Sequence, residues 1–65
     1  MSVVFLGAEI IKAIGSEGLE ISEILEGMSK ALEVSYDHMV LALEWIFIID
    51  AVFVDDGRVK IYDAA

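Results

Sequence analysis

The sequence predicts a small α+β domain, mostly helical, in which three helices are followed by a two-stranded β-hairpin. Apolar residues recur at helical spacing in three successive segments. After the third segment, apolar and polar residues alternate as is typical of strands. This alternation surrounds an Asp-Gly pair that strongly favours a hairpin turn. With 65 residues the chain suffices for a single domain, residues 1–65, and its 58% hydrophobic content excludes intrinsic disorder.

The first helix is predicted over Val3–Ile14. Its apolar residues are spaced by four, one and three positions, so they share one helical face. Gly15 favours a stop directly after it. Gly7 and Gly27 lie inside the first and second helices, where each costs about 1 kcal/mol relative to alanine, and a close approach of helices would explain both. The buried face of the first helix consists of Leu6, Ile10, Ile11 and Ile14.

The second helix is predicted over Glu23–Leu32. Ser22 is placed to cap it, and the carboxylate of Glu23 in the first turn is favoured by the helix dipole. The preceding segment Leu19–Ile21 either forms a very short strand or simply leads into the helix in an extended conformation. The expected buried face consists of Ile24, Leu25, Met28 and Leu32.

The third helix is predicted from a Ser35 cap to about Ile49. Val34 and Met39 occupy the two positions of a hydrophobic staple, and Asp37 lies in the first turn. One apolar stripe of this helix is assigned to the core, and it consists of Ala42, Leu43, Ile46 and Ile49.

The hairpin turn is predicted at Asp56-Gly57. A two-residue loop places Asp55 opposite Arg58, where the two are expected to form an outward-facing ion pair. Three helices followed by a hairpin match the plan of a winged helix-turn-helix, with the second and third helices as the helix-turn-helix and the hairpin as the wing. The inward face of the wing consists of Val52, Val54, Val59 and Ile61.

The charge of the chain argues against nucleic acid and anionic membranes as partners. Twelve acidic residues against four basic ones give a net charge of −8, and residues 31–57 contain no lysine or arginine. A DNA-reading third helix needs cationic or amide side chains on its outer face. A small dimeric transcriptional regulator that binds DNA through its few basic residues stays open as a second hypothesis. Those residues are Lys12, Lys30, Arg58 and Lys60.

No group of residues in the sequence suggests catalysis or a bound cofactor. Cysteine is absent, His38 is the only histidine, and no serine has a base partner at a recognisable spacing. No segment reaches the length of a membrane span, and the start of the chain lacks a basic region typical of a signal peptide. We therefore expect a cytoplasmic protein that is not an enzyme, with no cofactor, no metal, no nucleic acid and no membrane contact.

A second apolar stripe on the third helix suggests a protein-interaction surface. A helix that is apolar on two sides must be covered on two sides, and so short a chain has no further layer to cover it. Trp45 either lies over the first helix or the wing as a large core residue, or belongs to this contact face. The candidate interface residues are Leu41, Trp45 and Ile48 on this stripe, with Val3, Val4 and Phe5 at the N-terminus.

The stripe alone supports only weak association. Burying its three side chains contributes roughly 5–9 kcal/mol. Association itself costs about 4–15 kcal/mol. We therefore expect the isolated chain to self-associate weakly and to bind its partner more tightly.

Several short segments, spread over nearly the whole chain, carry a resemblance to a known family. They are Gly7–Ile11, Ile21–Leu25, Ser35–Asp37, Leu41–Ile46 and Asp56–Arg58. With these segments the chain resembles the small winged-helix middle components of prokaryotic ABC-three-component systems. The resemblance implies an adaptor that bridges an ABC-type ATPase and an effector in a conflict system directed against invaders. It carries over no catalytic residue.

Overall fold

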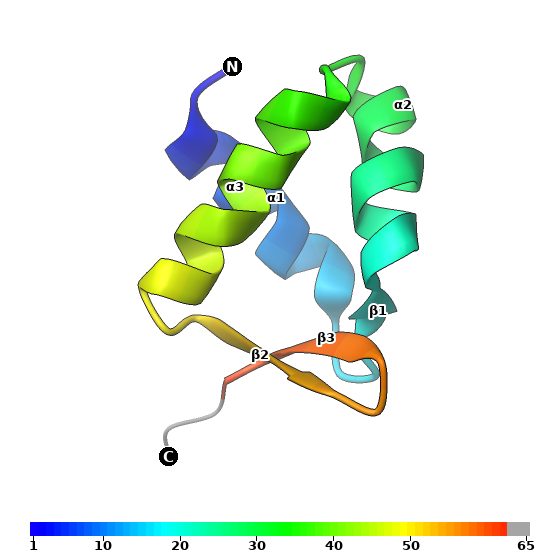
Figure 1. The fold of residues 1–65 in the computed structure, drawn as a ribbon, viewed down its shortest axis with the longest axis vertical. Helices are drawn as coiled ribbons and strands as arrows, with labels where there is room; N and C mark the ends of the chain where they lie inside the picture. The colour runs from blue at the N-terminus through cyan, green and yellow to red at the C-terminus, as the bar shows by residue number, and fades with distance from the viewer. Residues whose placement is uncertain (63–65) are drawn as a thin grey trace.

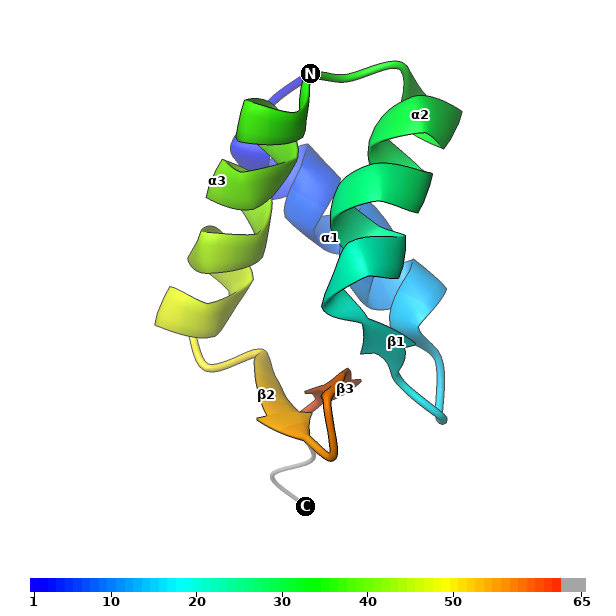
Figure 2. The same ribbon diagram turned by 45° about the vertical axis from the view of Figure 1, so that its right-hand side comes forward.

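The computed structural model describes residues 1–62 and places the three helical segments above one end of a small antiparallel sheet (Figure 1). A single hydrophobic core lies where α1, η1 and α3 meet the sheet, and Figure 2 shows the same layering from a second side. The predicted α+β class is confirmed. The elements are α1 (Val3–Ile14), β1 (Leu19–Glu20), η1 (Glu23–Met28), α2 (Ser29–Leu32), α3 (Tyr36–Ile48), β2 (Val52–Asp55) and β3 (Arg58–Ile61).

The first helix has the predicted bounds. Ser2 caps α1, because its Oγ accepts a hydrogen bond from the backbone N–H of Phe5 at 3.1 Å. Gly15 follows the last turn with φ +62°, a conformation that glycine adopts without steric cost. The predicted inner face is confirmed: three of its residues are buried and the fourth, Ile11, is partly buried against the core.

Gly7 lies at a close contact between α1 and α3. A Cβ atom there would lie 2.9 Å from Ile46 Cγ2 and 3.2 Å from Trp45 Cδ1. The close approach predicted for Gly7 is therefore confirmed. The same prediction is wrong for Gly27, which is exposed and has no atom within 4 Å of a hypothetical Cβ.

The two helical glycines are expected to respond oppositely to alanine. Gly7→Ala overpacks the α1–α3 contact and should lower the free energy of unfolding by about 1–3 kcal/mol. Gly27→Ala meets open space and gains helix propensity, so it should raise that free energy by about 0.5–1 kcal/mol. Urea denaturation of both variants measures the difference. Equal changes in the two variants would contradict the crossing of α1 and α3 at Gly7.

The second helix has the predicted bounds, because η1 and α2 together span Glu23–Leu32, but its cap differs from the prediction. Ser22 already has helical backbone angles and makes no capping hydrogen bond, so the predicted Ser22 cap is wrong. The backbone N–H of Glu20 instead donates to Glu23 Oε1 at 3.1 Å, which is one half of a capping box. The reason is that β1 ends at Glu20 and the chain is already helical at Ile21 and Ser22, so Ser22 cannot adopt the extended conformation of a cap.

The first turns of this helix are wider than an α-helix. η1 is a π-helix, in which hydrogen bonds join residues five apart, and the chain continues from it directly into α2. Ser29, five residues after the fully buried Ile24, is consequently buried on the same side. Its Oγ donates to the carbonyl of Glu26 at 3.0 Å. The other residues of the predicted face are partly buried against the core, and these are Leu25, Met28 and Leu32.

The third helix begins as predicted. Ser35 Oγ accepts from the backbone N–H of His38 at 3.1 Å, which makes Ser35 the cap. The predicted core stripe is buried except for Ile49, whose side chain is 47% exposed. This part of the prediction is wrong because α3 ends at Ile48. The chain then turns away at Asp50, which has φ +58°.

The sheet has three strands rather than the two of the predicted hairpin. Their order is β1-β3-β2, with all neighbours antiparallel. β1 pairs with β3 through Leu19 opposite Val59 and Glu20 opposite Arg58. Of the two possibilities for Leu19–Ile21, a strand is therefore formed by Leu19–Glu20. The register of the hairpin itself is confirmed, with Val52 opposite Ile61, Phe53 opposite Lys60, Val54 opposite Val59 and Asp55 opposite Arg58.

Only half of the predicted inner face of the wing is covered. Val52 and Val59 are buried, whereas Val54 and Ile61 are 51% and 40% exposed. The two buried residues are diagonal neighbours in the register, as expected where a strongly twisted ribbon passes beneath a small core. The prediction that all four residues are buried is wrong because the helices cover only this diagonal.

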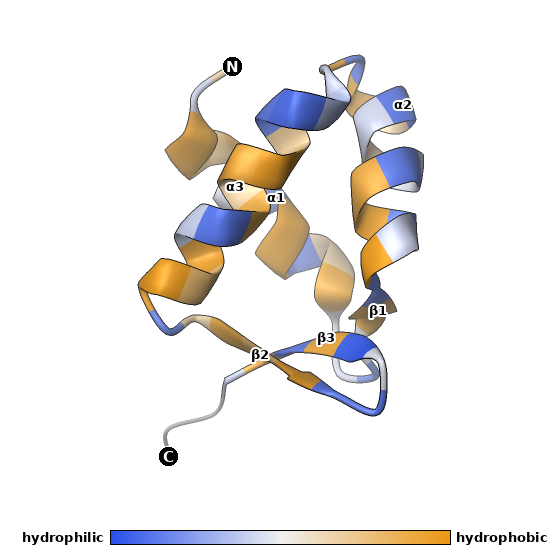
Figure 3. Ribbon diagram, in the orientation of Figure 1, coloured by the Kyte–Doolittle hydropathy of each residue, from blue (hydrophilic) through white to orange (hydrophobic). Residues whose placement is uncertain are grey.

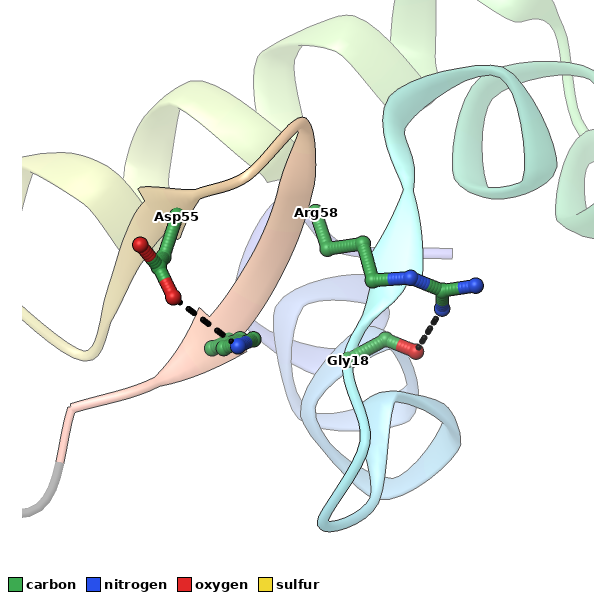
Figure 4. Close-up of polar contacts among 4 residues, drawn as sticks. Gly18, Asp55 and Arg58 are labelled. Atoms are coloured by element: carbon green, nitrogen blue, oxygen red, sulfur yellow. Dashed lines mark hydrogen bonds and ion pairs between the residues drawn. The ribbon is translucent and has the colours of Figure 1, made fainter.

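The predicted ion pair between Asp55 and Arg58 is also wrong. Asp55 accepts instead from Lys60 Nζ at 3.0 Å, across the same face of the hairpin. Arg58 reaches the other way and donates to the Gly18 carbonyl at 3.0 Å (Figure 4). Because β1 lies beside β3, Gly18, the residue directly before β1, offers Arg58 a backbone acceptor that a two-stranded hairpin would lack.

The hairpin turn has the conformation that Asp-Gly pairs favour. Asp56 and Gly57 have φ +53° and +74°, as a type I′ turn requires. Gly57→Val places a β-branched residue in this region and should lower the free energy of unfolding by about 1 kcal/mol or more. Thermal melting measures the loss, and an unchanged melting temperature would contradict the turn type.

Candidate protein-interaction surface

The first turn of α1 exposes apolar side chains. Val4 is 62% exposed and Phe5 50% exposed, whereas Val3 is partly buried against the core. This turn begins only two residues into the chain and is held by the Ser2 cap. The structure therefore presents Val4 and Phe5 to solvent on an ordered helix.

The outer face of α3 exposes two more of the candidate residues. Leu41 is 55% exposed and Ile48 is 73% exposed. They are seven residues apart, which is close to two full turns, so they lie on the same face of the helix. Figure 3 shows apolar residues in orange on these turns of α3 and on the first turn of α1.

Trp45 lies between these two exposed regions. It is partly buried, packs against the core, and its ring faces the backbone of Gly7 on α1. The absence of a side chain at Gly7 leaves the space that the indole ring needs. Trp45 thus supports the packing of α1 on α3 and keeps part of its ring at the surface.

An apolar groove that the sequence analysis did not anticipate lies beside this face, between η1 and α3. Its volume is about 420 Å³, and among residues 1–62 Glu44 is the only charged residue that lines it. The sequence does carry a signal for this groove, because the flank of α3 has apolar residues that do not belong to the core stripe. The groove is lined by Leu25, Val40, Leu43, Glu44, Phe47 and Ile48.

A second hollow lies at the sheet end of the molecule, and sequence analysis did not predict it either. The rings of Phe53 and Tyr62 meet edge to face there, with their centroids 5.8 Å apart. Gly15, Ser16 and Lys60 complete most of its lining, and its volume is about 500 Å³. Tyr62 joins the edge of the sheet because its backbone N–H donates to the Ala51 carbonyl at 2.8 Å.

The basic residues do not form a patch on α3. Lys12 pairs with Glu9 at 3.6 Å on α1, and both Lys60 and Arg58 have partners within the sheet region. α3, the helix that would enter a DNA groove, carries Asp37 and Glu44 and no cation.

We expect duplex DNA binding to be weaker than that of non-specific DNA-binding proteins. With a net charge of −8, the chain should bind duplex DNA at physiological salt more weakly than the Kd range of about 10⁻⁴–10⁻⁶ M that is typical of non-specific binding. Fluorescence anisotropy with a labelled duplex, titrated at two salt concentrations, measures it. Micromolar binding that weakens with salt would favour the transcriptional-regulator hypothesis.

Within residues 1–62, no group of three or more histidine, cysteine, aspartate or glutamate side chains is arranged to hold a metal ion. No helix among the same residues is long and apolar enough to cross a membrane.

Comparison with known proteins supports the family resemblance that the sequence motifs indicated. No curated protein and no solved structure matches the chain significantly. A family model does match it, over residues 1–62, and its description is ABC-three component (ABC-3C) system Middle Component 6. Because that match covers nearly all of the 65 residues, the chain belongs to the Middle Component 6 family of ABC-three component systems.

Proposed function

We propose that this protein is a non-enzymatic adaptor of winged-helix type that bridges an ABC-type ATPase and an effector in a prokaryotic defence system. Its family describes a middle component of a multi-component system, and such a component has protein partners. The order of its elements, helix, strand, two helices and a hairpin, supports the winged-helix assignment. On this proposal the protein acts in the cytoplasm and carries no cofactor.

The observation that carries the proposal is the chemistry of the outer face of α3. A DNA-binding protein of this plan would place cations there, and this chain places Leu41 and Ile48 there instead, both more than half exposed. Apolar side chains held in water on a rigid helix mark a surface that another protein covers.

Bridging two partners requires two separate surfaces. Gly7 marks the side of α1 that faces α3. Phe5 lies two residues earlier, which on a helix is a rotation of about 200°, so its side chain points away from α3. We propose that Leu41, Trp45 and Ile48 contact one partner, and that the N-terminal turn contacts the other through the exposed Val4 and Phe5, with Val3 anchoring the turn against the core.

Co-purification tests this proposal. The chain is tagged and co-expressed with an ABC-type ATPase and an effector of the same three-component system, and we expect all three to elute together. Leu41→Glu should remove one partner and Phe5→Glu the other. Ala13→Glu adds the same charge at an exposed position of α1 outside both surfaces and should retain both partners. Loss of neither partner in either variant, or co-elution of neither with the wild type, would overturn the proposal.

A further inference from the structure

We propose that the groove between η1 and α3 binds a cationic amphipathic helix supplied by one of the partner proteins. This inference rests on the proposed adaptor function and adds the chemistry of one partner. The groove is a different surface from the outer stripe of α3, although Ile48 borders both.

The groove is apolar and is left unfilled by the described part of the chain. Leu25 forms its wall on η1, and the other wall is formed by four apolar residues of α3 and by Glu44. The two helices lie side by side in Figures 1 and 2 and are in contact. Because Phe47 and Ile48 lie at one end and Val40 at the other, the groove follows α3 for about two turns. That length suits a helix that inserts apolar residues from successive turns.

The part of the chain that contains both groove-forming helices is strongly acidic. Residues 21–48 carry five carboxylates and one lysine, all exposed. Within this stretch Glu44 lies in the groove wall itself. Charges at the edge of an interface select partners of opposite sign and accelerate their encounter. The acidic residues are Glu23, Glu26, Glu33, Asp37 and Glu44, and the lysine is Lys30.

The same charges disfavour the other occupants. A second copy of the chain would bring its own net charge of −8 against this acidic surface. Nucleic acids and anionic membranes would be repelled in the same way. An apolar groove with Glu44 in its wall, in an acidic stretch of the chain, is matched by a helix whose apolar stripe is flanked by lysine or arginine.

Two designed helical peptides provide the probe. Both present leucines at positions i, i+3, i+4 and i+7, and they differ only in having either lysine or glutamate at the flanking positions. The ¹⁵N-labelled wild-type protein is titrated with each peptide and followed by NMR. We expect the lysine peptide to bind in the micromolar range and to shift the amide resonances of residues 25, 40, 44, 47 and 48. The glutamate peptide should leave them unchanged.

A charge reversal with a matched control tests whether the groove itself is responsible. Glu44→Lys should weaken binding of the lysine peptide by about five- to tenfold, the effect expected of one surface charge pair that becomes repulsive. Glu17→Lys changes the net charge equally, but it lies in the exposed turn between α1 and β1 and should weaken binding by less than about twofold. Circular dichroism of both variants verifies that the fold is retained.

Three results would overturn the inference. They are equal binding of the two peptides, equal effects of the two variants, and shifts of the resonances of residues 25, 40 and 47, which lie in the groove but not on the outer stripe, on concentrating the protein without peptide. The third result would make a second copy the occupant. Each is distinguishable from failure of the adaptor proposal. Co-elution of the ATPase and effector without peptide binding would reject only the groove inference, whereas peptide binding without co-elution would reject only the bridging role.

Discussion

Replacing Gly18 by alanine is expected to lower the free energy of unfolding by about 2–4 kcal/mol, through overpacking and backbone strain together. Gly18 has φ +84°, and a Cβ there would lie 2.9 Å from the carbonyl oxygen of Val59 and 2.9 Å from Lys60 Cγ. Val59 is in the central strand of the sheet, so the clash is with backbone that cannot move without disturbing the β1–β3 pairing. In a domain of this size the melting temperature should fall by about 10–25 °C.

The matched control for Gly18→Ala is Gly57→Ala. Gly57 also has positive φ, at +74°, but a Cβ there meets no atom within 4 Å. That variant isolates the backbone strain and should cost only about 1 kcal/mol. Thermal and urea denaturation of both variants measure the difference. Equal losses of stability would show that the packing of Gly18 against β3 contributes nothing.

The second large loss of stability is expected for Trp45→Glu. Trp45 packs against the core and against Gly7, so the change removes much of the contact between α1 and α3. We expect a loss of about 2–4 kcal/mol, somewhat below the range for a fully buried tryptophan because part of the ring is at the surface. Denaturation measures this loss, and sedimentation at several concentrations measures association of the folded fraction.

Leu41→Glu separates association from stability. Leu41 is 55% exposed, and glutamate has a helix propensity close to that of leucine, so the stability should change by no more than about 0.5 kcal/mol. The weak self-association expected of the wild type should nevertheless disappear, since a charge replaces an apolar contact. If Trp45→Glu melted like the wild type, Trp45 would act at the surface alone. If Leu41→Glu associated like the wild type, the outer stripe would not be the contact surface.

The candidate surface was only partly foreseeable from the sequence. Helical spacing separates Leu41 and Ile48 from the core stripe of α3, and this is a property of one helix. The packing of Trp45 against Gly7 depends on where two helices cross. The groove beside Leu25 depends on the distance between η1 and α3. Neither the position of the helix crossing nor the distance between η1 and α3 can be read from a local sequence pattern.

The sequence by itself determined the features that depend on interactions between neighbouring residues. The bounds of α1, the Ser35 cap and the hairpin register all depend on interactions over a few residues, such as a side chain accepting from a backbone N–H three positions away. Asp56-Gly57 fixes the register because the positive φ of both residues suits a two-residue turn.

Only the tertiary structure decided the features that join distant segments. β1 is two residues long and exists because β3 lies beside it, forty positions along the chain from Leu19 to Val59. The same pairing replaces the predicted Ser22 cap, redirects Arg58 to the Gly18 carbonyl and leaves Asp55 to Lys60. Which residues of the wing are buried depends on how far three short helices extend over a twisted sheet. The free energy of such contacts comes from burying surfaces that meet only after folding. These contacts therefore cannot be read from the order of residues along the chain.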